Sequence, residues 1–291
     1  MSTSSPNSLD SRPAARTPHG QLWAILAELG IRPRKALGQH FLHDRSVVQR
    51  IVATAALAPD TLVVEIGPGL GILTEELARQ AGQVIAIELD RQLAAHLAER
   101  FQDTNVQVLH DDALRVDFAT ITQRQPYVVV ANLPYNVATP ILERLLTAEH
   151  PPERLVVMVQ REVAERMVAT PPKMSFLSVL VQFFARPRIA FRVGPGAFTP
   201  PPKVESAVVI LERREPPLPR GEWPRFFRLV QAGFAQRRKQ LVNALASELA
   251  LDKERVRALL IAAGIAPNRR AETLTLDEWL RLYEAFREEL R

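Results

Sequence analysis

Four apolar runs in the first half of the chain, each ending in glycine or in polar side chains, constrain the fold more than any other feature. They span residues 61–66, 83–87, 106–109 and 127–131. The runs are rich in β-branched residues, and helical stretches at 72–80 and 91–101 separate the first three. Continuous runs of this length are typical of strands that are buried on both faces of a parallel sheet. The sequence therefore predicts an α/β fold, a doubly wound sheet with helices on both faces.

The first run leads into the segment Glu65-Ile66-Gly67-Pro68-Gly69-Leu70-Gly71, a glycine loop at the first strand-to-helix crossover. Glycines let the backbone approach a ligand that a Cβ atom would push away. A dinucleotide fingerprint requires Gly-X-Gly-X-X-Gly, whereas Ile72 stands where its third glycine should be. A shorter glycine loop behind a carboxylate suits S-adenosylmethionine, which has no pyrophosphate but carries an ammonium group. A tight structural turn is the alternative explanation of these glycines.

The next two strands end in carboxylates. Glu88 follows Gly67 by 21 residues, close to the spacing at which an acidic side chain reaches ribose hydroxyls in such sheets. Asp111 and Asp112 follow the third strand, where a carboxylate can accept a hydrogen bond from an adenine amine. Solvated surface charges are the alternative for all three. Because ligands bind at the carboxyl ends of the strands in open α/β sheets, these residues predict one nucleoside-like cofactor site.

The fourth strand ends in Asn132-Leu133-Pro134-Tyr135, the most informative tetrapeptide of the chain. The Asn132 amide and the Pro134 main chain supply two carbonyl acceptors, and Tyr135 supplies a flat ring. These groups suit the binding of an exocyclic amine on a planar base. A simple turn is the alternative, because Asn and Pro both favour turns. The agreement of four successive strand ends favours a site.

With these residues, the chain resembles the ribosomal RNA adenine dimethyltransferase family, which modifies two adjacent adenosines near the 3′ end of small-subunit ribosomal RNA. The resemblance runs from about Arg34 to the end of the chain. It rests further on Leu37-Gly38-Gln39-His40-Phe41-Leu42, Ala197-Phe198-Thr199-Pro200-Pro201-Pro202-Lys203-Val204 and Phe234-Ala235-Gln236-Arg237-Arg238-Lys239. It implies a Rossmann-like S-adenosylmethionine-dependent methyltransferase sheet, a small all-α C-terminal domain, and S-adenosylmethionine as the cofactor.

The resemblance also implies which side chains bind the cofactor, and these are His40, Leu42, Gly67, Glu88, Asp112 and Asn132. His40 stands where the family usually carries asparagine, so an imidazole with a different reach would replace an amide. The segment Lys173-Met174-Ser175-Phe176-Leu177-Ser178 departs from the family as well, which more often has a Tyr-Gly pair before its Leu-Ser. The substrate role of this loop is left open.

In the implied reaction, the Asn132 side-chain carbonyl and the Pro134 main-chain carbonyl accept the N–H groups of an adenine amine. The nitrogen can then pyramidalise and attack the sulfonium methyl. No strong general base is required, and orientation supplies most of the catalysis. The adenosine must leave its stack to reach the site, and we expect Tyr135 and Phe198 to stack on its two faces. Core packing is the alternative for Phe198.

Composition excludes several other classes of protein. The chain of 291 residues has no cysteine, which removes disulfides, thiolate metal sites and thiol nucleophiles. Its six histidines form no zinc-like pattern, so no metal is expected. No apolar run has membrane-spanning length and no signal-peptide pattern is found, so we expect a cytoplasmic monomer that does not bind a membrane. The net charge of +5 favours an anionic partner.

The chain divides into four segments. Their predicted bounds are 1–20, 21–211, 212–222 and 223–291. The first is a tail with little to bury, the second is the methyltransferase domain, the third is a charged proline-rich linker, and the last is a helical RNA-binding domain. In that domain Arg237, Arg238 and Lys239 belong to a basic stretch without acidic neighbours, which predicts contacts with RNA phosphates. A solvated helix face is the alternative.

The sequence thus predicts an enzyme that dimethylates N6 of two adjacent adenosines of 16S rRNA within a pre-30S particle, with a role in small-subunit maturation. A macrolide-resistance methyltransferase of large-subunit RNA is the alternative within the same architecture. The segments around Phe198 and at 234–239 argue against it. A binding factor for small-subunit assembly, without a catalytic role, is the alternative from a different class, and the intact glycines, Glu88 and Asn132 argue that catalysis is retained.

Overall fold

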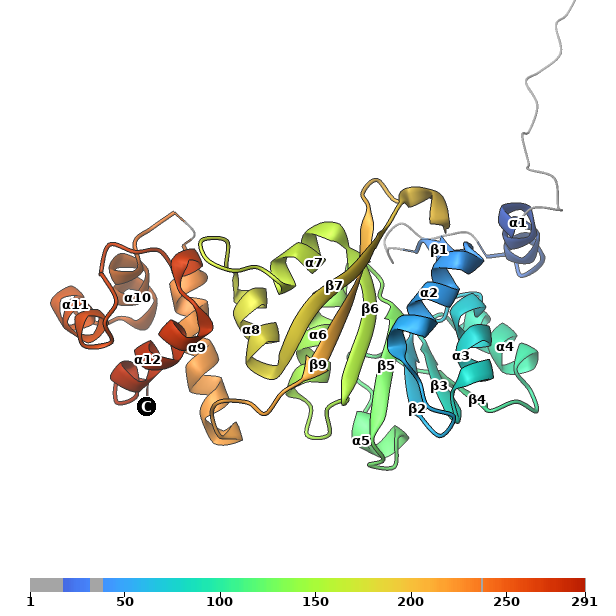
Figure 1. The fold of residues 1–291 in the computed structure, drawn as a ribbon, viewed down its shortest axis with the longest axis horizontal. Helices are drawn as coiled ribbons and strands as arrows, with labels where there is room; N and C mark the ends of the chain where they lie inside the picture. Colours follow the sequence, from blue (N-terminus) through green and yellow to red (C-terminus); the bar gives the residue numbers. More distant parts are fainter. Residues whose placement is uncertain (1–17, 32–38, 237, 291) are drawn as a thin grey trace, which may run out of the picture.

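The computed structural model describes residues 18–31, 39–236 and 238–290. Figure 1 shows a twisted sheet flanked by helices, with a separate group of helices at the end of the molecule that holds the C-terminus. Residues 1–17 of the predicted tail, two residues of one family segment (37 and 38) and Arg237 lie outside the described residues. Helix α1 (Pro18–Glu28) begins inside the segment that composition predicts to be a tail.

In the described part of the chain the main sheet has seven strands in the order β4-β3-β2-β5-β6-β9-β7. Their bounds are β2 (Leu62–Ile66), β3 (Gln83–Glu88), β4 (Val106–His110), β5 (Tyr127–Asn132), β6 (Arg154–Gln160), β7 (Ala185–Val193) and β9 (Ser206–Arg213). The first five strands in this order are parallel, and β9 pairs antiparallel with both β6 and β7. The strand order reverses between β2 and β5, and ligands bind at such a switch point in open α/β sheets.

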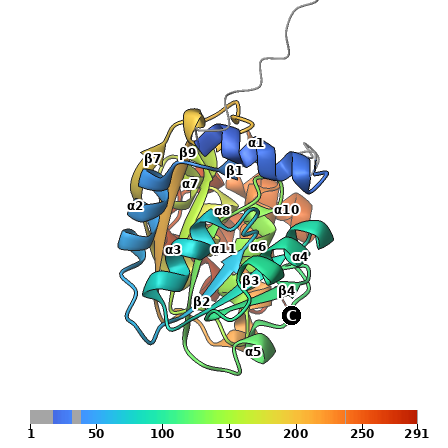
Figure 2. The same ribbon diagram turned by 90° about the vertical axis from the view of Figure 1, so that its right-hand side faces the viewer.

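Helices cover both faces of the sheet, as the apolar runs predict (Figure 2). Neighbouring strand residues point to opposite faces, so Val63 belongs to the core that includes α2 (Arg45–Ala55) and α3 (Ile72–Gln80), whereas Val64 belongs to the core that includes α6 (Ala138–Thr147) and α8 (Phe176–Phe184). The remaining helices beside the sheet are α4 (Arg91–Arg100), α5 (Phe118–Ile121) and α7 (Arg161–Met167).

The C-terminal part is helical, and its core is continuous with the core under the sheet. It comprises η3 (Arg220–Glu222), α9 (Trp223–Phe234), α10 (Leu241–Leu249), α11 (Lys253–Ala262), η4 (Ala271–Thr273) and α12 (Leu276–Phe286). Phe183 of α8 stacks on Phe226 of α9 with ring centroids 5.0 Å apart, and Phe184 meets Trp223 edge to face at 4.8 Å. The division at 211 into separate domains stays a prediction, and the strand that contains this residue runs on to Arg213.

A small two-stranded sheet closes the end of the main sheet at which the predicted site residues gather. It pairs β1 (Phe41–Leu42) with β8 (Phe198–Thr199), which follows η2 (Pro195–Ala197). Phe41 also packs in a small cluster with Leu22 and Leu26 of α1 and with Leu70 of the glycine loop. Two family segments that are about 160 residues apart in the sequence therefore lie side by side, and the N-terminal helix supports one of them.

Candidate active site

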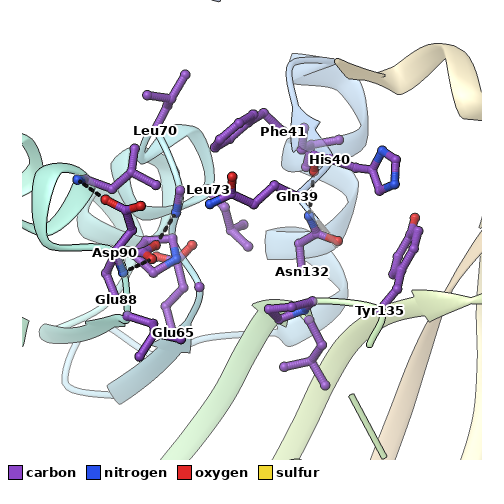
Figure 3. A pocket seen from close by; sticks show the side chains of 18 of the residues that line it. Gln39, His40, Phe41, Glu65, Leu70, Leu73, Glu88, Asp90, Asn132 and Tyr135 are labelled. Atoms are coloured by element: carbon purple, nitrogen blue, oxygen red, sulfur yellow. Dashed lines mark hydrogen bonds between the residues drawn. The ribbon is translucent and has the colours of Figure 1, made fainter. Parts of the chain in front are cut away.

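One cavity lies at the carboxyl ends of β2, β3 and β5, where the sequence predicts a ligand (Figure 3). Five of the predicted cofactor residues, namely His40, Leu42, Gly67, Glu88 and Asn132, line it together with Pro134 and Tyr135. They come from three strand ends and from β1, so the fold brings together side chains that lie up to 95 residues apart in the sequence. Asp112 and Phe198 are not among the lining residues.

The glycine loop forms one wall of this cavity. Gly67 and Gly69 have φ values of 68° and 60°, which residues with a Cβ atom rarely adopt. The Gly67 amide donates to the Ile87 carbonyl at 2.9 Å, and a Cβ atom on Gly69 would lie 3.1 Å from the Phe41 ring. Glycine is therefore required here both by the backbone angles and by the close approach of β1.

Glu88 is held rigidly at the end of β3. One carboxylate oxygen accepts from the Gly69 amide at 3.1 Å, and the other accepts from the Asp90 amide at 2.9 Å. The side chain is 6% exposed, and burial raises its pKa although these backbone hydrogen bonds oppose the shift. Each carboxylate oxygen has two acceptor sites, so Glu88 can still accept hydrogen bonds from the hydroxyl groups of a ligand in the cavity.

Glu65 lies behind the glycine loop and is almost fully buried at 1% exposed. Burial raises its pKa to about 8; the nearby Thr74 hydroxyl opposes the shift, and the nearby Glu88 carboxylate adds to it. Its Oε2 atom is buried without a hydrogen-bond partner among the described residues. A buried carboxyl group that lines a cavity and keeps one oxygen unpartnered is well suited to a cationic ligand group.

The Asn132 amide is oriented by the backbone of β1. Its Nδ2 atom donates to the His40 carbonyl at 3.5 Å, a long hydrogen bond whose acceptor fixes which end of the amide faces it. The Oδ1 atom is buried and has no partner among the described residues. Figure 3 shows this side chain between the Glu88 region of the cavity and Tyr135. Asn132 therefore presents an unpartnered carbonyl oxygen at the centre of the cavity.

Tyr135 and His40 form the other end of the cavity. The rings have centroids 5.4 Å apart and are tilted by 33°. The Tyr135 hydroxyl shares a hydrogen bond of 2.5 Å with the Ser206 hydroxyl, and burial raises the pKa of this phenol. The Nδ1 atom of His40 hydrogen-bonds the Pro200 carbonyl at 2.7 Å, which requires a proton on that nitrogen. In Figure 3 the imidazole lies beside Tyr135 and far from Glu88.

Three predicted residues lie in positions that the sequence does not reveal. Phe198 is 2% exposed and packs in the core beneath α2, which is the alternative given for it above. Asp112 is half-buried in the loop after β4, where it accepts from the Leu114 amide at 2.9 Å. The Pro134 carbonyl accepts from the Val137 amide at 3.2 Å and keeps one free lone pair. The roles of all three stay predictions.

The cavity also contains side chains that sequence reasoning missed. Gln39 points into its centre from the residue before His40, as Figure 3 shows. Leu89 lines it and is 55% exposed, and Asp90 lines it while its carboxylate begins α4 by accepting from the Gln92 amide. The available signal was that Gln39 belongs to the family segment around His40 and that Leu89 and Asp90 directly follow Glu88.

Two of the three basic residues predicted to bind RNA lie in the loop between α9 and α10. Arg238 and Lys239 are exposed, and neither has an ion pair with a described residue, whereas Arg237 lies outside the described residues. In the part of the chain that the structure describes, no group of acidic, histidine or cysteine side chains is arranged to hold a metal. None of its helices is long and apolar enough to cross a membrane.

Comparison with known proteins decides the family. The model of the family described as Ribosomal RNA adenine dimethylase matches residues 30–288. The chain belongs to the ribosomal RNA adenine dimethylase family. Its membership confirms the predicted methyltransferase sheet, the enzyme class and S-adenosylmethionine as the cofactor.

Individual relatives of the ribosomal RNA adenine dimethylase family span most of the chain. A Dehalococcoides mccartyi protein named Ribosomal RNA small subunit methyltransferase A is 48% identical over 252 residues, covering 86% of this chain and 87% of the relative. A Moorella thermoacetica protein of the same name is 45% identical over 273 residues, covering 89% and 94%.

Two solved structures are similar to this dimethylase. One is the 23S rRNA methyltransferase ErmE, with a TM-score of 0.67 and 32% identity, covering 84% of this chain and 98% of that chain. The other is a dimethyladenosine transferase from Plasmodium falciparum, with a TM-score of 0.71 and 24% identity, covering 86% and 98%. The second likeness concerns the fold alone.

Proposed function

We propose that this chain transfers methyl groups from S-adenosylmethionine to N6 of two adjacent adenosines near the 3′ end of small-subunit rRNA, which gives N6,N6-dimethyladenosine. The observation that carries the proposal is the Asn132 amide, whose nitrogen is engaged by the His40 carbonyl and whose oxygen is buried without a partner. A buried unpartnered carbonyl is costly unless a ligand donates to it. The exocyclic amine of adenine is a donor of the right kind.

The residues of the cavity fit S-adenosylmethionine. Glu88 would accept the ribose hydroxyls, and the exposed Leu89 beside it offers an apolar face for the adenine. Glu65, with its unpartnered oxygen, would stabilise the ammonium group, and the glycine loop would let the backbone approach. When bound, the cofactor supplies an activated methyl group on a sulfonium.

The target amine would be oriented by acceptors and not by a base. Asn132 Oδ1 accepts one N–H of the amine, and the free lone pair of the Pro134 carbonyl accepts the other. Tyr135 supports one face of the base, and its hydroxyl is held by Ser206, so the ring is fixed before the substrate arrives. The amine lone pair is then directed to the methyl group. Preorganised orientation of this kind makes a large contribution to catalysis.

The RNA partner we propose is small-subunit rRNA within a pre-30S particle, bound by a cytoplasmic monomer. The exposed Arg238 and Lys239 and the net charge of +5 support an RNA phosphate contact outside the cavity. Membership of the adenine dimethylase family supports RNA as the substrate.

Methylation of large-subunit RNA is the second candidate, because ErmE shares the fold at 32% identity. The small-subunit methyltransferases share 45–48% with this chain and therefore favour the first. Mass spectrometry after incubation of each unmethylated subunit with the purified protein separates the two. Two adjacent dimethyladenosines in the small subunit are expected. Methylation of the large subunit alone would refute the proposal.

Asn132→Ala tests the mechanism in the same assay. At saturating RNA and cofactor its single-turnover rate should fall about fivefold to thirtyfold, because the amine loses an orienting acceptor worth about 1–2 kcal/mol. RNA affinity should stay close to that of the wild type. Asn243→Ala, in α10 and away from the cavity, is the matched control. A full single-turnover rate in Asn132→Ala would remove Asn132 from the mechanism.

A further inference from the structure

The loop from Pro200 to Ser206 runs from the end of β8 to the first residue of β9 and is fastened to the cavity at both ends. At its start the Pro200 carbonyl accepts from the His40 ring at 2.7 Å. At its end the Ser206 hydroxyl hydrogen-bonds the Tyr135 hydroxyl at 2.5 Å. His40 and Tyr135 are the two rings at the substrate end of the cavity. The loop is therefore positioned by the residues that would receive the target base.

A third fastening holds the loop against α7. The Arg161 amide donates to the Glu205 carbonyl at 2.9 Å, and the Arg161 guanidinium pairs with the Glu205 carboxylate at 2.7 Å. The three consecutive prolines at 200–202 restrict the backbone further. A loop of this length that is fastened at three points holds its outer side chains in fixed directions.

The properties of two of these outer side chains favour RNA as the partner of the loop. Val204 is 47% exposed and is one of the four exposed large apolar side chains in the described residues. Lys203 beside it is exposed and has no ion pair with a described residue, while the only acid of the loop, Glu205, is already neutralised by Arg161. An exposed apolar tip next to an unpaired cation resembles the wedge and phosphate contact of proteins that unstack nucleic-acid bases.

We infer that the 200–206 loop is an RNA wedge, in which Val204 fills the space left by the flipped adenosine and Lys203 contacts a neighbouring phosphate. The inference rests on the proposed function, since an adenosine must leave its stack to reach Asn132. Val204 would occupy the gap in the RNA stack while Tyr135 receives the flipped base. The hydrogen bond between Tyr135 and Ser206 fixes the distance between these two contacts. Base flipping and base capture would thus be performed by one connected unit.

Fluorescence separates the wedge from methyl transfer. Small-subunit particles carry 2-aminopurine in place of the first target adenosine, so that its emission rises when the base is unstacked. Wild-type protein should raise the emission, and Val204→Ala should reduce the unstacked population about tenfold, because two methyl groups no longer fill the gap. Val204→Leu retains a branched apolar side chain, one methylene larger, and should resemble the wild type. Equal emission with Val204→Ala and wild type would overturn the inference.

Methylation of unmodified particles gives the second arm. On unmodified particles, Val204→Ala should slow single-turnover methylation about tenfold. On particles with an abasic nucleotide beside the target, where the stacking of the target is already weakened, the same variant should slow methylation less than twofold. An equal loss on both particles would show a structural role and refute the wedge. Lys203→Gln should lower the slope of log affinity against log salt by about 0.7–0.9, and an unchanged slope would refute its phosphate contact. If wild-type protein brightens 2-aminopurine but methylates nothing, the proposed function fails and the wedge stands.

Discussion

Replacing Glu65 with glutamine is expected to stabilise the cofactor-free protein at pH 8 far more than at pH 5. In the folded protein, burial raises the pKa of Glu65 to about 8 from its ordinary value of 4.5. The folded state therefore holds a proton that the unfolded chain releases. The resulting stability is fully present below pH 4.5 and is lost as the pH rises to about 8.

The size of the effect follows from this difference in pKa. A rise from 4.5 to about 8 corresponds to about 5 kcal/mol over the whole range at about 1.4 kcal/mol per unit. Between pH 5 and pH 8 the wild type should lose about 3–4 kcal/mol relative to Glu65→Gln. Any constant effect of the amide, such as its contact with Thr74, cancels when the two pH values are compared.

Urea unfolding of both proteins between pH 5 and pH 8, without cofactor, measures the effect. The difference in unfolding free energy should grow steadily with pH and level off near pH 8. Glu254→Gln, at a side chain 74% exposed in the first turn of α11, is the control and should show little change. A difference between wild type and Glu65→Gln that does not vary with pH would refute the assignment of a buried, protonated Glu65.

Two further outcomes are expected. Glu88→Ala should weaken S-adenosylmethionine binding at least tenfold by calorimetry, because hydrogen bonds to a charged acceptor contribute about 1.5–3 kcal/mol each; unchanged affinity in a folded variant would contradict the ribose assignment. Replacing Arg238 and Lys239 with glutamine should lower the slope of log RNA affinity against log salt by about 0.7–0.9 per lost phosphate contact, with the single-turnover rate at saturating RNA preserved. An unchanged slope would place the RNA phosphates elsewhere.

The strand ends of the site were predictable because their arrangement follows from local patterns. Buried parallel strands have a clear signature, and their carboxyl ends meet at one edge, so Gly67, Glu88 and Asn132 line one cavity as expected. The antiparallel pairing of β9 with β6 carries no comparable signal, because it joins residues about 50 apart in the sequence, and the pairing of β9 with its nearer neighbour β7 is interrupted by a register shift between Ile189 and Phe191. These three strands were accordingly not predicted.

Side-chain directions account for the remaining differences. Phe198 stands before three prolines, and nothing in the sequence tells whether its ring faces the cavity or the core, where it packs beneath α2. Gln39 and His40 are adjacent and directly precede β1. Successive side chains of an extended backbone point in opposite directions, so His40 lies toward Tyr135 and Gln39 points into the cavity. Which residue takes which direction is set by the Pro200 carbonyl that binds the imidazole, a partner 160 residues away.

The aromatic contacts that join α8 to α9 fix the arrangement of two parts of the protein that we propose to contact the RNA. Phe183 and Phe226 stack at 5.0 Å within one continuous core, so the helical part cannot turn against the sheet without breaking that packing. This packing therefore fixes the helical part relative to the sheet edge that carries Asn132. If RNA phosphates bind at Arg238 and Lys239 and the target adenosine binds at Asn132, as we propose, an RNA whose phosphates and adenosine match the distance between these residues contacts both, whereas a shorter or longer RNA contacts only one. Selection among RNAs can then arise from length, without any reading of sequence.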